Sequence, residues 1–141
     1  MGDGTILFVS GSNMGLSRMA EGLLRRVLPG VGVSSAGVDV DPDDRGVDED
    51  ARLALGEVGA RCDGDPLQLT PSLADSYDRV IVLGDIDVSR CIAPDRPIER
   101  WLWEDPMDQG VAGLPRYRVL REWLRDRIRG LTAELGEPPL H

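Results

Sequence analysis

The sequence predicts an α/β domain with a small four-stranded parallel sheet and helices on both faces, in a doubly wound arrangement. Two short runs rich in Val, Ile and Leu, Thr5–Val9 and Arg79–Leu83, are typical of strands buried on both faces. Segments with helical spacing of apolar residues alternate with strand-like segments, and such alternation favours a parallel sheet. The length of 141 residues suits one domain over residues 1–141.

The first half of the chain predicts two strand–helix units. The strand at Thr5–Val9 is followed by a loop of small residues and by a helix over Arg18–Leu28, with Ser17 as the expected N-cap. A second strand is expected over Val31–Ala36, because apolar residues alternate there. A second helix is expected over Val47–Val58, and a glycine follows it.

The second half predicts two further strands and a closing helix. Thr70 and Pro71 suit the N-cap and first residue of a short helix. The strand at Arg79–Leu83 follows, and Ile98–Trp101 is expected to form a short fourth strand. Apolar residues at helical spacing over Pro115–Leu135 predict an amphipathic helix that closes the fold.

Composition excludes several classes of function. The 16 basic residues are all Arg and face 25 acidic ones, so the net charge of −9 argues against nucleic-acid binding. No run of about 18 apolar residues predicts a membrane span, and the acidic N-terminus leads directly into a strand, so we expect a cytoplasmic protein without a secretory signal. The acidic segment Asp39–Asp50 lacks the spacing of a calcium loop, and no metal site is expected. Cys62 and Cys91 are interpreted as lone thiols.

The main candidate site is the loop from Ser10 to Ser17. A helix start leaves backbone N–H groups unpaired and carries a partial positive charge. A loop of small residues before it can direct further N–H groups at one anion, although a plain tight turn has the same composition. The Gly-Lys-Ser/Thr and Gly-x-Gly-x-x-Gly patterns of nucleotide loops are absent. The predicted ligand is a small oxyanion such as phosphate, arsenate or sulfate. The predicted anion-binding residues are Ser10, Gly11, Ser12, Asn13, Met14, Gly15, Leu16, Ser17 and Arg18.

Several segments resemble one known family. Ile6–Glu21 resembles the signature of low-molecular-weight protein tyrosine phosphatases and of the arsenate reductases that share their fold: Val-Cys, two residues, Asn, two residues, Arg-Ser, then Met-Ala-Glu. Val33–Gly37 is similar to the family's Ser-Ala-Gly strand end. Asp78–Asp85 and Glu99–Pro106 look like the mycothiol-dependent arsenate reductases of actinobacteria in particular. The order and spacing of these segments agree from Thr5 to about Leu131.

The resemblance also shows which catalytic groups differ. It implies a nucleophilic cysteine where this chain has Ser10, and an oxyanion-gripping arginine where it has Leu16. A serine hydroxyl ionises far less readily than a thiol and needs an adjacent base, and the only histidine is the terminal His141. The family's general acid falls on Asp105, with Glu104 as an alternative.

The remaining matches do not decide the activity. The resemblance implies that Asn13 and Ser17 brace the loop, which a binding protein and an enzyme both need. Arg18 is expected on the helix surface, or leaning back over the loop. The thioredoxin-linked reductases carry two cysteines seven residues apart, and here the first position is Gly84 and the second Cys91. A lone cysteine cannot resolve an intramolecular disulfide, so Cys91 is a weak redox candidate.

Three hypotheses follow. In the first, the chain is a degenerate member that binds an oxyanion without thiol chemistry and acts as a binding or regulatory module, with a protein as a candidate partner. Alternatively it is an active arsenate–mycothiol transferase or phosphatase in which Ser10 is an engineered trap; mycothiol would then be the co-substrate, and no cofactor is expected otherwise. In the third, the fold serves different chemistry through Ser10, Ser12, Asp105 or Glu104. The closing helix and the tryptophans at 101–103 suit a core or a dimer face equally, so the oligomeric state stays open.

Overall fold

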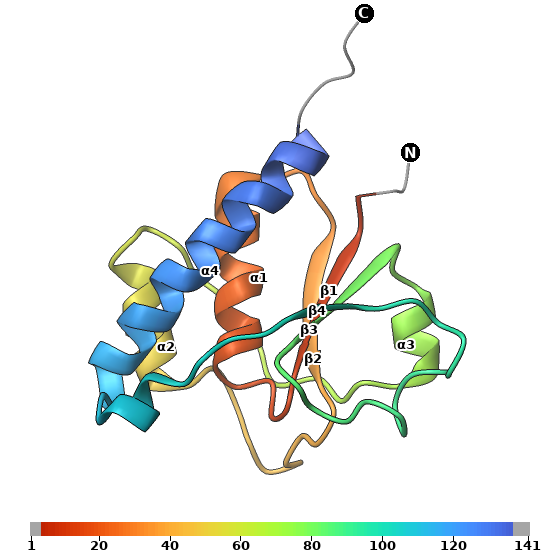
Figure 1. The fold of residues 1–141 in the computed structure, drawn as a ribbon, viewed down its shortest axis with the longest axis horizontal. Coiled ribbons are helices and arrows are strands. Elements are labelled where there is room, and N and C mark those ends of the chain that lie inside the picture. Colours follow the sequence, from red (N-terminus) through yellow and green to blue (C-terminus); the bar gives the residue numbers. More distant parts are fainter. Residues whose placement is uncertain (1–3, 137–141) are drawn as a thin grey trace, which may run out of the picture.

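The computed structural model contains a four-stranded parallel sheet with the strand order β2-β1-β3-β4 (Figure 1). The strands are β1 (Ile6–Ser10), β2 (Val33–Gly37), β3 (Arg79–Leu83) and β4 (Glu99–Trp101). β1 pairs with β2 and β3, and β3 pairs with β4, all in parallel. This arrangement confirms the predicted fold class.

The helices lie on both faces of the sheet. α1 (Leu16–Val27), α2 (Glu49–Gly56) and α4 (Gly113–Gly136) cover one face, and the short α3 (Pro71–Asp75) covers the other (Figure 1). A 3₁₀ turn at Pro106–Gln109 precedes α4. Because all strands of a parallel sheet point in the same direction, the loops that follow the strands gather at its carboxyl end.

The structure describes residues 4–136. His141, the only histidine, lies outside this range, as do residues 1–3, on which the expectation of no secretory signal rests. Within it, no helix is both long and apolar enough to cross a membrane.

The central strand explains the uninterrupted apolar run. Successive side chains of a strand point to opposite faces. Ile6 and Phe8 therefore enter the core beneath α1, α2 and α4, whereas Leu7 and Val9 enter the core on the α3 side. Both faces are covered, so all four side chains are fully buried. Trp101 of β4 packs against Phe8 with a ring-centroid distance of 5.6 Å, which places aromatic burial in the larger core.

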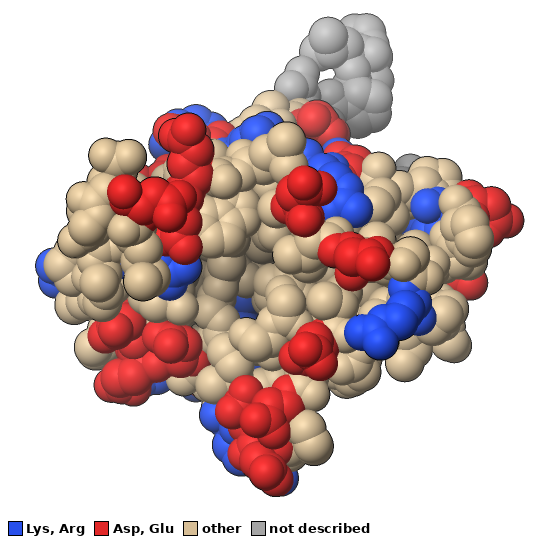
Figure 2. All heavy atoms as spheres, turned by 60° about the horizontal axis from the view of Figure 1, so that its bottom comes forward, with Lys and Arg blue, Asp and Glu red and all other residues tan. Residues whose placement is uncertain are grey.

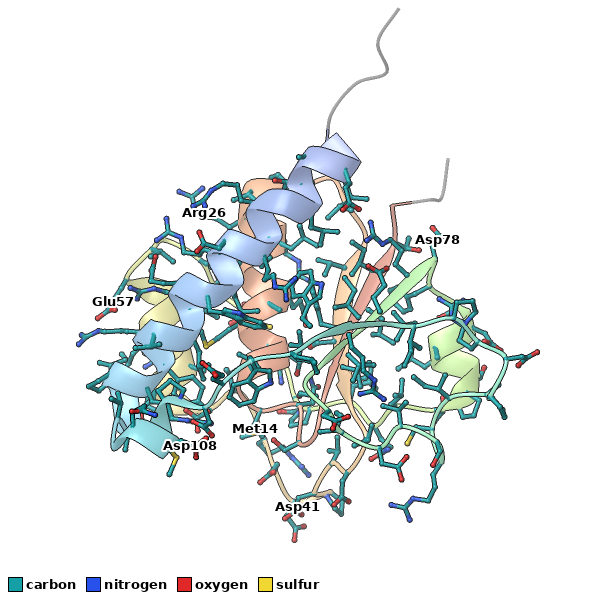
Figure 3. All side chains as sticks on the ribbon, in the orientation of Figure 1. Met14, Arg26, Asp41, Glu57, Asp78 and Asp108 are labelled. Atoms are coloured by element: carbon teal, nitrogen blue, oxygen red, sulfur yellow. The ribbon has the colours of Figure 1, made fainter. Side chains whose placement is uncertain are left out.

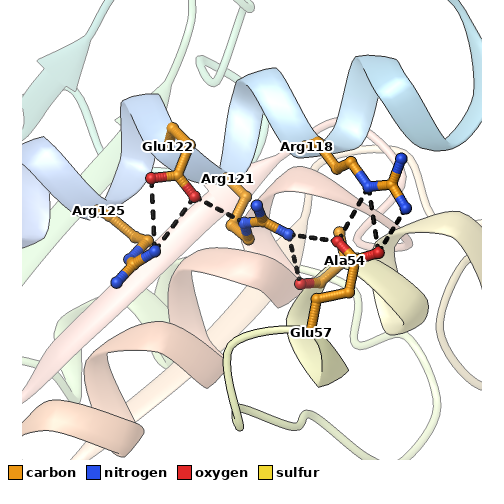
Figure 4. Close-up of polar contacts among 6 residues, drawn as sticks. All are labelled: Ala54, Glu57, Arg118, Arg121, Glu122 and Arg125. Atoms are coloured by element: carbon orange, nitrogen blue, oxygen red, sulfur yellow. Dashed lines mark hydrogen bonds and ion pairs between the residues drawn. The ribbon is translucent and has the colours of Figure 1, made fainter.

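Ion pairs join α4 to α2 on the outer side of that core. The Glu57 carboxylate, just after α2, accepts hydrogen bonds from Arg118 and Arg121 of α4 (Figure 4). Arg121 also donates to the backbone carbonyl of Ala54 at 3.0 Å. These contacts fix the position of α4, whose N-terminal turn adjoins the candidate site.

Several predicted boundaries change. Ser17 is not the N-cap of the first helix: α1 begins at Leu16, its N-cap is Gly15, and no side chain caps it. The second strand is Val33–Gly37 rather than Val31–Ala36. α2 begins at Glu49 because the Asp48 carboxylate accepts the N–H groups of residues 50 and 51. The predicted cap at Thr70 is confirmed, since its side chain accepts the N–H of residue 73.

Candidate functional site

The loop between β1 and α1 lies at the carboxyl end of the sheet. Figure 3 places Met14 of this loop at the same end of the molecule as Asp108, and Asp78, which precedes β3, at the opposite end. Figure 2 turns the carboxyl end toward the viewer and shows a hollowed face with acidic side chains around it. The loop therefore occupies the position where open α/β sheets bind ligands.

The loop presents unpaired backbone donors to a pocket. The N–H groups of Ser12, Met14, Gly15 and Leu16 donate no hydrogen bond to any residue in the range 4–136. The start of α1 adds the positive end of the helix dipole. The pocket has a volume of about 300 Å³. Its lining from the loop consists of Ser10, Gly11, Ser12, Met14, Gly15 and Leu16. This arrangement is able to hold an anion through backbone groups.

Asn13 braces the loop from beneath, and its side chain is only 1% exposed. Its amide nitrogen donates to Ser17 Oγ at 2.8 Å and to Ser35 Oγ at 2.9 Å. Its amide oxygen accepts the Leu67 N–H at 2.8 Å. Asn13 also has a φ of 58°, a left-handed conformation that asparagine tolerates better than most residues. The amide thus ties the turn to β2 and to the segment before α3.

Arg18 is buried, so its expected place on the helix surface is wrong. The side chain is 2% exposed, and it does not line the loop pocket. The guanidinium donates to the backbone carbonyls of Asn13, Gly46, Asp63 and Gly64. Because the carbonyl of Asn13 in the loop and three carbonyls from other segments occupy its donors, its side chain ties the loop to those segments and does not face the pocket.

Ser10 has hydrogen-bond partners but no base. Its Oγ lies 2.6 Å from Ser17 Oγ and accepts the Asn13 N–H at 3.3 Å. Ser17 Oγ already accepts from the Asn13 amide, which leaves its own proton available for Ser10. Ser10 would then accept twice and keep its proton free for the pocket. Among the described residues, no carboxylate or imidazole hydrogen-bonds to Ser10.

Leu16 belongs to the core as well as to the pocket. Its side chain is 9% exposed and packs in the cluster beneath α1, α2 and α4. An alkyl side chain supplies no hydrogen bond or charge to an anion, so the positive charge that the resemblance implies at this position is missing.

Asp105 lies in an ion pair at the edge of the site. Both of its carboxylate oxygens accept from Arg116 of α4, at 2.8 and 3.0 Å. It also caps the 3₁₀ turn by accepting the Met107 N–H. The Arg116 guanidinium first, and the Met107 N–H second, hold the pKa of Asp105 below its usual value. A carboxyl held in its charged form is a poor proton donor, so the general-acid role stays a prediction. Glu104 lies with Asp105 in a neighbouring pocket of about 690 Å³.

Two residues of α4 that sequence reasoning missed complete the loop pocket. Arg116 and Tyr117 line it, together with Asp48 from the N-terminus of α2. A Cβ added to Gly15 would lie 2.5 Å from the Tyr117 hydroxyl oxygen, so the first turn of α4 packs directly on the loop. Burial first, and the nearby Asp48 second, raise the pKa of Tyr117. No sequence spacing could have found these residues, because tertiary packing alone brings them to the loop.

The cysteines take no part in this pocket. Cys62 and Cys91 are both buried, and no disulfide joins them. Burial raises the pKa of Cys62, whose sulfur accepts a hydrogen bond from Arg18. Gly84 has a φ of 102°, and a Cβ there would lie 2.9 Å from Trp103 Nε1. A cysteine at position 84 would thus require both strain and movement of the indole. Residues 4–136 contain no cluster of His, Cys, Asp and Glu suited to a metal ion.

Comparison with known proteins agrees with this geometry. The tyrosine phosphatase Wzb of Escherichia coli K30, in complex with sulfate, is 26% identical; the match covers 96% of this chain and 100% of that one, with a TM-score of 0.78. An arsenate reductase in a phosphate-binding state is 28% identical over 92% of this chain and 97% of that one, with a TM-score of 0.70. A mutant of the YwlE arginine phosphatase with a phosphorylated active-site serine is 25% identical over 94% and 96%, with a TM-score of 0.73.

The match to a protein family extends over nearly the whole chain. The model of the family described as low molecular weight phosphotyrosine protein phosphatase matches residues 5–138. The sheet order, the loop after β1 and the arsenate reductase and Wzb neighbours agree with this assignment. The chain therefore belongs to the low molecular weight phosphotyrosine protein phosphatase family.

Proposed function

We propose that this chain binds a small tetrahedral oxyanion in the loop from Ser10 to Ser17 and does not carry out the thiol chemistry of its family. The observation that carries the proposal is the pocket itself. Unpaired N–H groups line it, and the family resemblance implies a nucleophilic cysteine where this chain has Ser10 and an anion-gripping arginine where it has Leu16. Relatives bound to sulfate and in a phosphate-binding state support the ligand class.

Three features argue against turnover. Within residues 4–136, no base hydrogen-bonds to Ser10 to remove its proton, and a hydroxyl forms its anion far less readily than a thiol. Leu16 offers no charge to stabilise a transition state. Asp105 is paired with Arg116 and stays ionised at neutral pH, so it holds no proton for a leaving group.

Calorimetric titration with phosphate, sulfate and arsenate tests binding, alongside turnover assays with p-nitrophenyl phosphate and with arsenate plus mycothiol. We expect saturable binding and no turnover. The matched variants are Gly37→Ala and Gly56→Ala. A Cβ at Gly37 would lie 2.6 Å from the Gly11 carbonyl oxygen and 2.9 Å from the Asn13 nitrogen, whereas at Gly56 it meets open space. The first variant should weaken binding and the second should not. Clear turnover by the unaltered chain contradicts the proposal.

A second candidate is that Ser10 accepts a phosphoryl group and keeps it. The neighbour with a phosphorylated active-site serine favours this candidate. In this step the Ser10 Oγ–phosphorus bond forms, the bond from phosphorus to the phenolate oxygen of p-nitrophenyl phosphate breaks, and the hydroxyl proton passes to water. Intact-mass analysis would show the added phosphoryl group, and Ser10→Ala would abolish it. The trap hypothesis makes the same prediction and further requires a cysteine codon at position 10 in the natural gene.

The mycothiol-dependent subtype is proposed on the segments at 78–85 and 99–106 alone. The double variant Ser10→Cys with Leu16→Arg tests it, because mycothiol would serve as co-substrate only with a thiol at position 10. Reduction of arsenate by this variant with mycothiol supports the subtype. The hypothesis of different chemistry instead requires an activity that the family lacks and that Ser10→Ala abolishes.

A further inference from the structure

We propose that Arg116 supplies the positive charge that the loop lacks at position 16, and that Asp105, its ion-pair partner, draws the guanidinium away from the anion and offsets part of this charge. The ligand class is a tetrahedral dianion such as phosphate. This inference rests on the proposed function, because it assigns a further binding residue to the same loop.

The position of Arg116 carries the first step. It lies in the first turn of α4 and lines the same pocket as the loop N–H groups. The neighbouring Tyr117 packs on Gly15, which fixes this turn against the loop. The guanidinium carbon also lies 5.2 Å from the centroid of the Tyr117 ring. The charge of Arg116 therefore belongs to the loop pocket.

The hydrogen bonds of the guanidinium carry the second step. Nε and Nη2 donate to Asp105, and Nη1 donates to no residue within the range 4–136. The Arg116 side chain is paired with Asp105, and its 19% exposure leaves it open to the pocket. An arginine fixed in this way keeps donors free for a second anionic partner.

The charges around the pocket carry the third step. The Asp48 carboxylate also lines the pocket, and further acidic side chains surround the hollow (Figure 2). These carboxylates repel an anion, so the backbone N–H groups must bind it in an unfavourable electrostatic potential unless a cation offsets that potential. Arg116 is the cationic side chain among the described residues that line this pocket. Asp105 pairs with it and offsets part of its charge.

This arrangement predicts opposite effects from the two partners of one ion pair. Arg116→Gln removes the cation and should weaken phosphate binding by roughly tenfold or more, the effect expected for a hydrogen bond to a charged group. Arg116→Lys keeps the charge and should recover part of the affinity. Asp105→Asn keeps the cap on the 3₁₀ turn but frees the guanidinium, so it should tighten binding. In the double variant that combines Arg116→Gln with Asp105→Asn, this gain in affinity should disappear.

The experiment is a calorimetric phosphate titration of these variants, with Arg129→Gln as control. Arg129 lies on the same helix and pairs with Asp126 of that helix, away from the pocket. Thermal melting establishes that each variant is folded; if Arg116→Gln does not fold, Arg116→Lys and Asp105→Asn carry the test. A tightening by Asp105→Asn that survives in the double variant, or an Arg116→Gln affinity equal to that of the unaltered chain, overturns the role of Arg116. Failure of the unaltered chain to bind any of the three oxyanions overturns the proposed function instead.

Discussion

Replacing Asn13 by alanine should destabilise the whole fold as well as the loop. The Asn13 side chain is buried and makes three hydrogen bonds, to Ser17, Ser35 and the Leu67 N–H. Alanine would lose all three and would leave the Leu67 N–H without its acceptor. Each lost bond costs about 1 kcal/mol in typical mutational series.

The backbone adds a separate cost. Asn13 has a φ of 58°, where an ordinary L-residue loses roughly 1–2 kcal/mol. Together with the hydrogen bonds, the free energy of unfolding should fall by about 4 kcal/mol. Because small domains have a total stability of about 5–15 kcal/mol, such a loss is large enough to measure accurately.

Urea denaturation followed by tryptophan fluorescence measures this change, and Asn13→Gly separates its two parts. Glycine loses the same three hydrogen bonds but adopts positive φ without strain. The glycine variant should therefore be more stable than the alanine variant by about 1 kcal/mol. A loss below about 1 kcal/mol for alanine would refute the reasoning on the hydrogen bonds, and equal losses for the two variants would refute the reasoning on backbone strain.

Two further predictions concern groups outside the pocket. The pKa of Glu57 is lowered from 4.5 to about 2 by hydrogen bonds from Arg118 and Arg121 (Figure 4). Because the pKa of Glu57 is lower in the folded state than in the unfolded state, the ionised carboxylate stabilises the fold at pH values above the unfolded pKa. This contribution should be lost as the pH falls from 4.5 toward 2. Urea midpoints should show Glu57→Gln less stable than the unaltered chain at neutral pH, with the difference vanishing near the lower value. Cys62 and Cys91 are buried, so a thiol reagent should modify them only when the protein unfolds; fast modification under native conditions contradicts this.

The sequence predicted the elements that depend on local pattern. The buried strands at β1 and β3 were predictable because both faces of the sheet are covered and all positions must be apolar. Thr70 and Pro71 predicted the start of α3 because the cap is formed within four residues. These features are local, and a single segment contains all the atoms that decide them.

The errors concern residues whose partners lie outside the helix to which the sequence pattern assigns them. Ser17 has the chemistry of an N-cap, but Asn13 and Ser10 engage its hydroxyl and the helix begins one residue earlier. Arg18 has the charge of a surface residue, but carbonyls at positions 46, 63 and 64 bind it in the interior. Arg116 was missed for the same reason, since only the packing of α4 brings it to the loop.

The distribution of these contacts separates the positions that hold the loop from those on which the proposed loss of thiol chemistry depends. Asn13 and Ser17 match the signature and are both buried in a hydrogen-bond network that holds the loop. Their loss would remove part of the fold, whatever the protein does with the pocket. Ser10 and Leu16 depart from the signature, and neither is required to brace the loop in this way. A serine still accepts the Asn13 N–H, and a leucine adds to the core. The retained residues are therefore evidence for the shape of the site, whereas the proposed loss of thiol chemistry rests on Ser10 and Leu16.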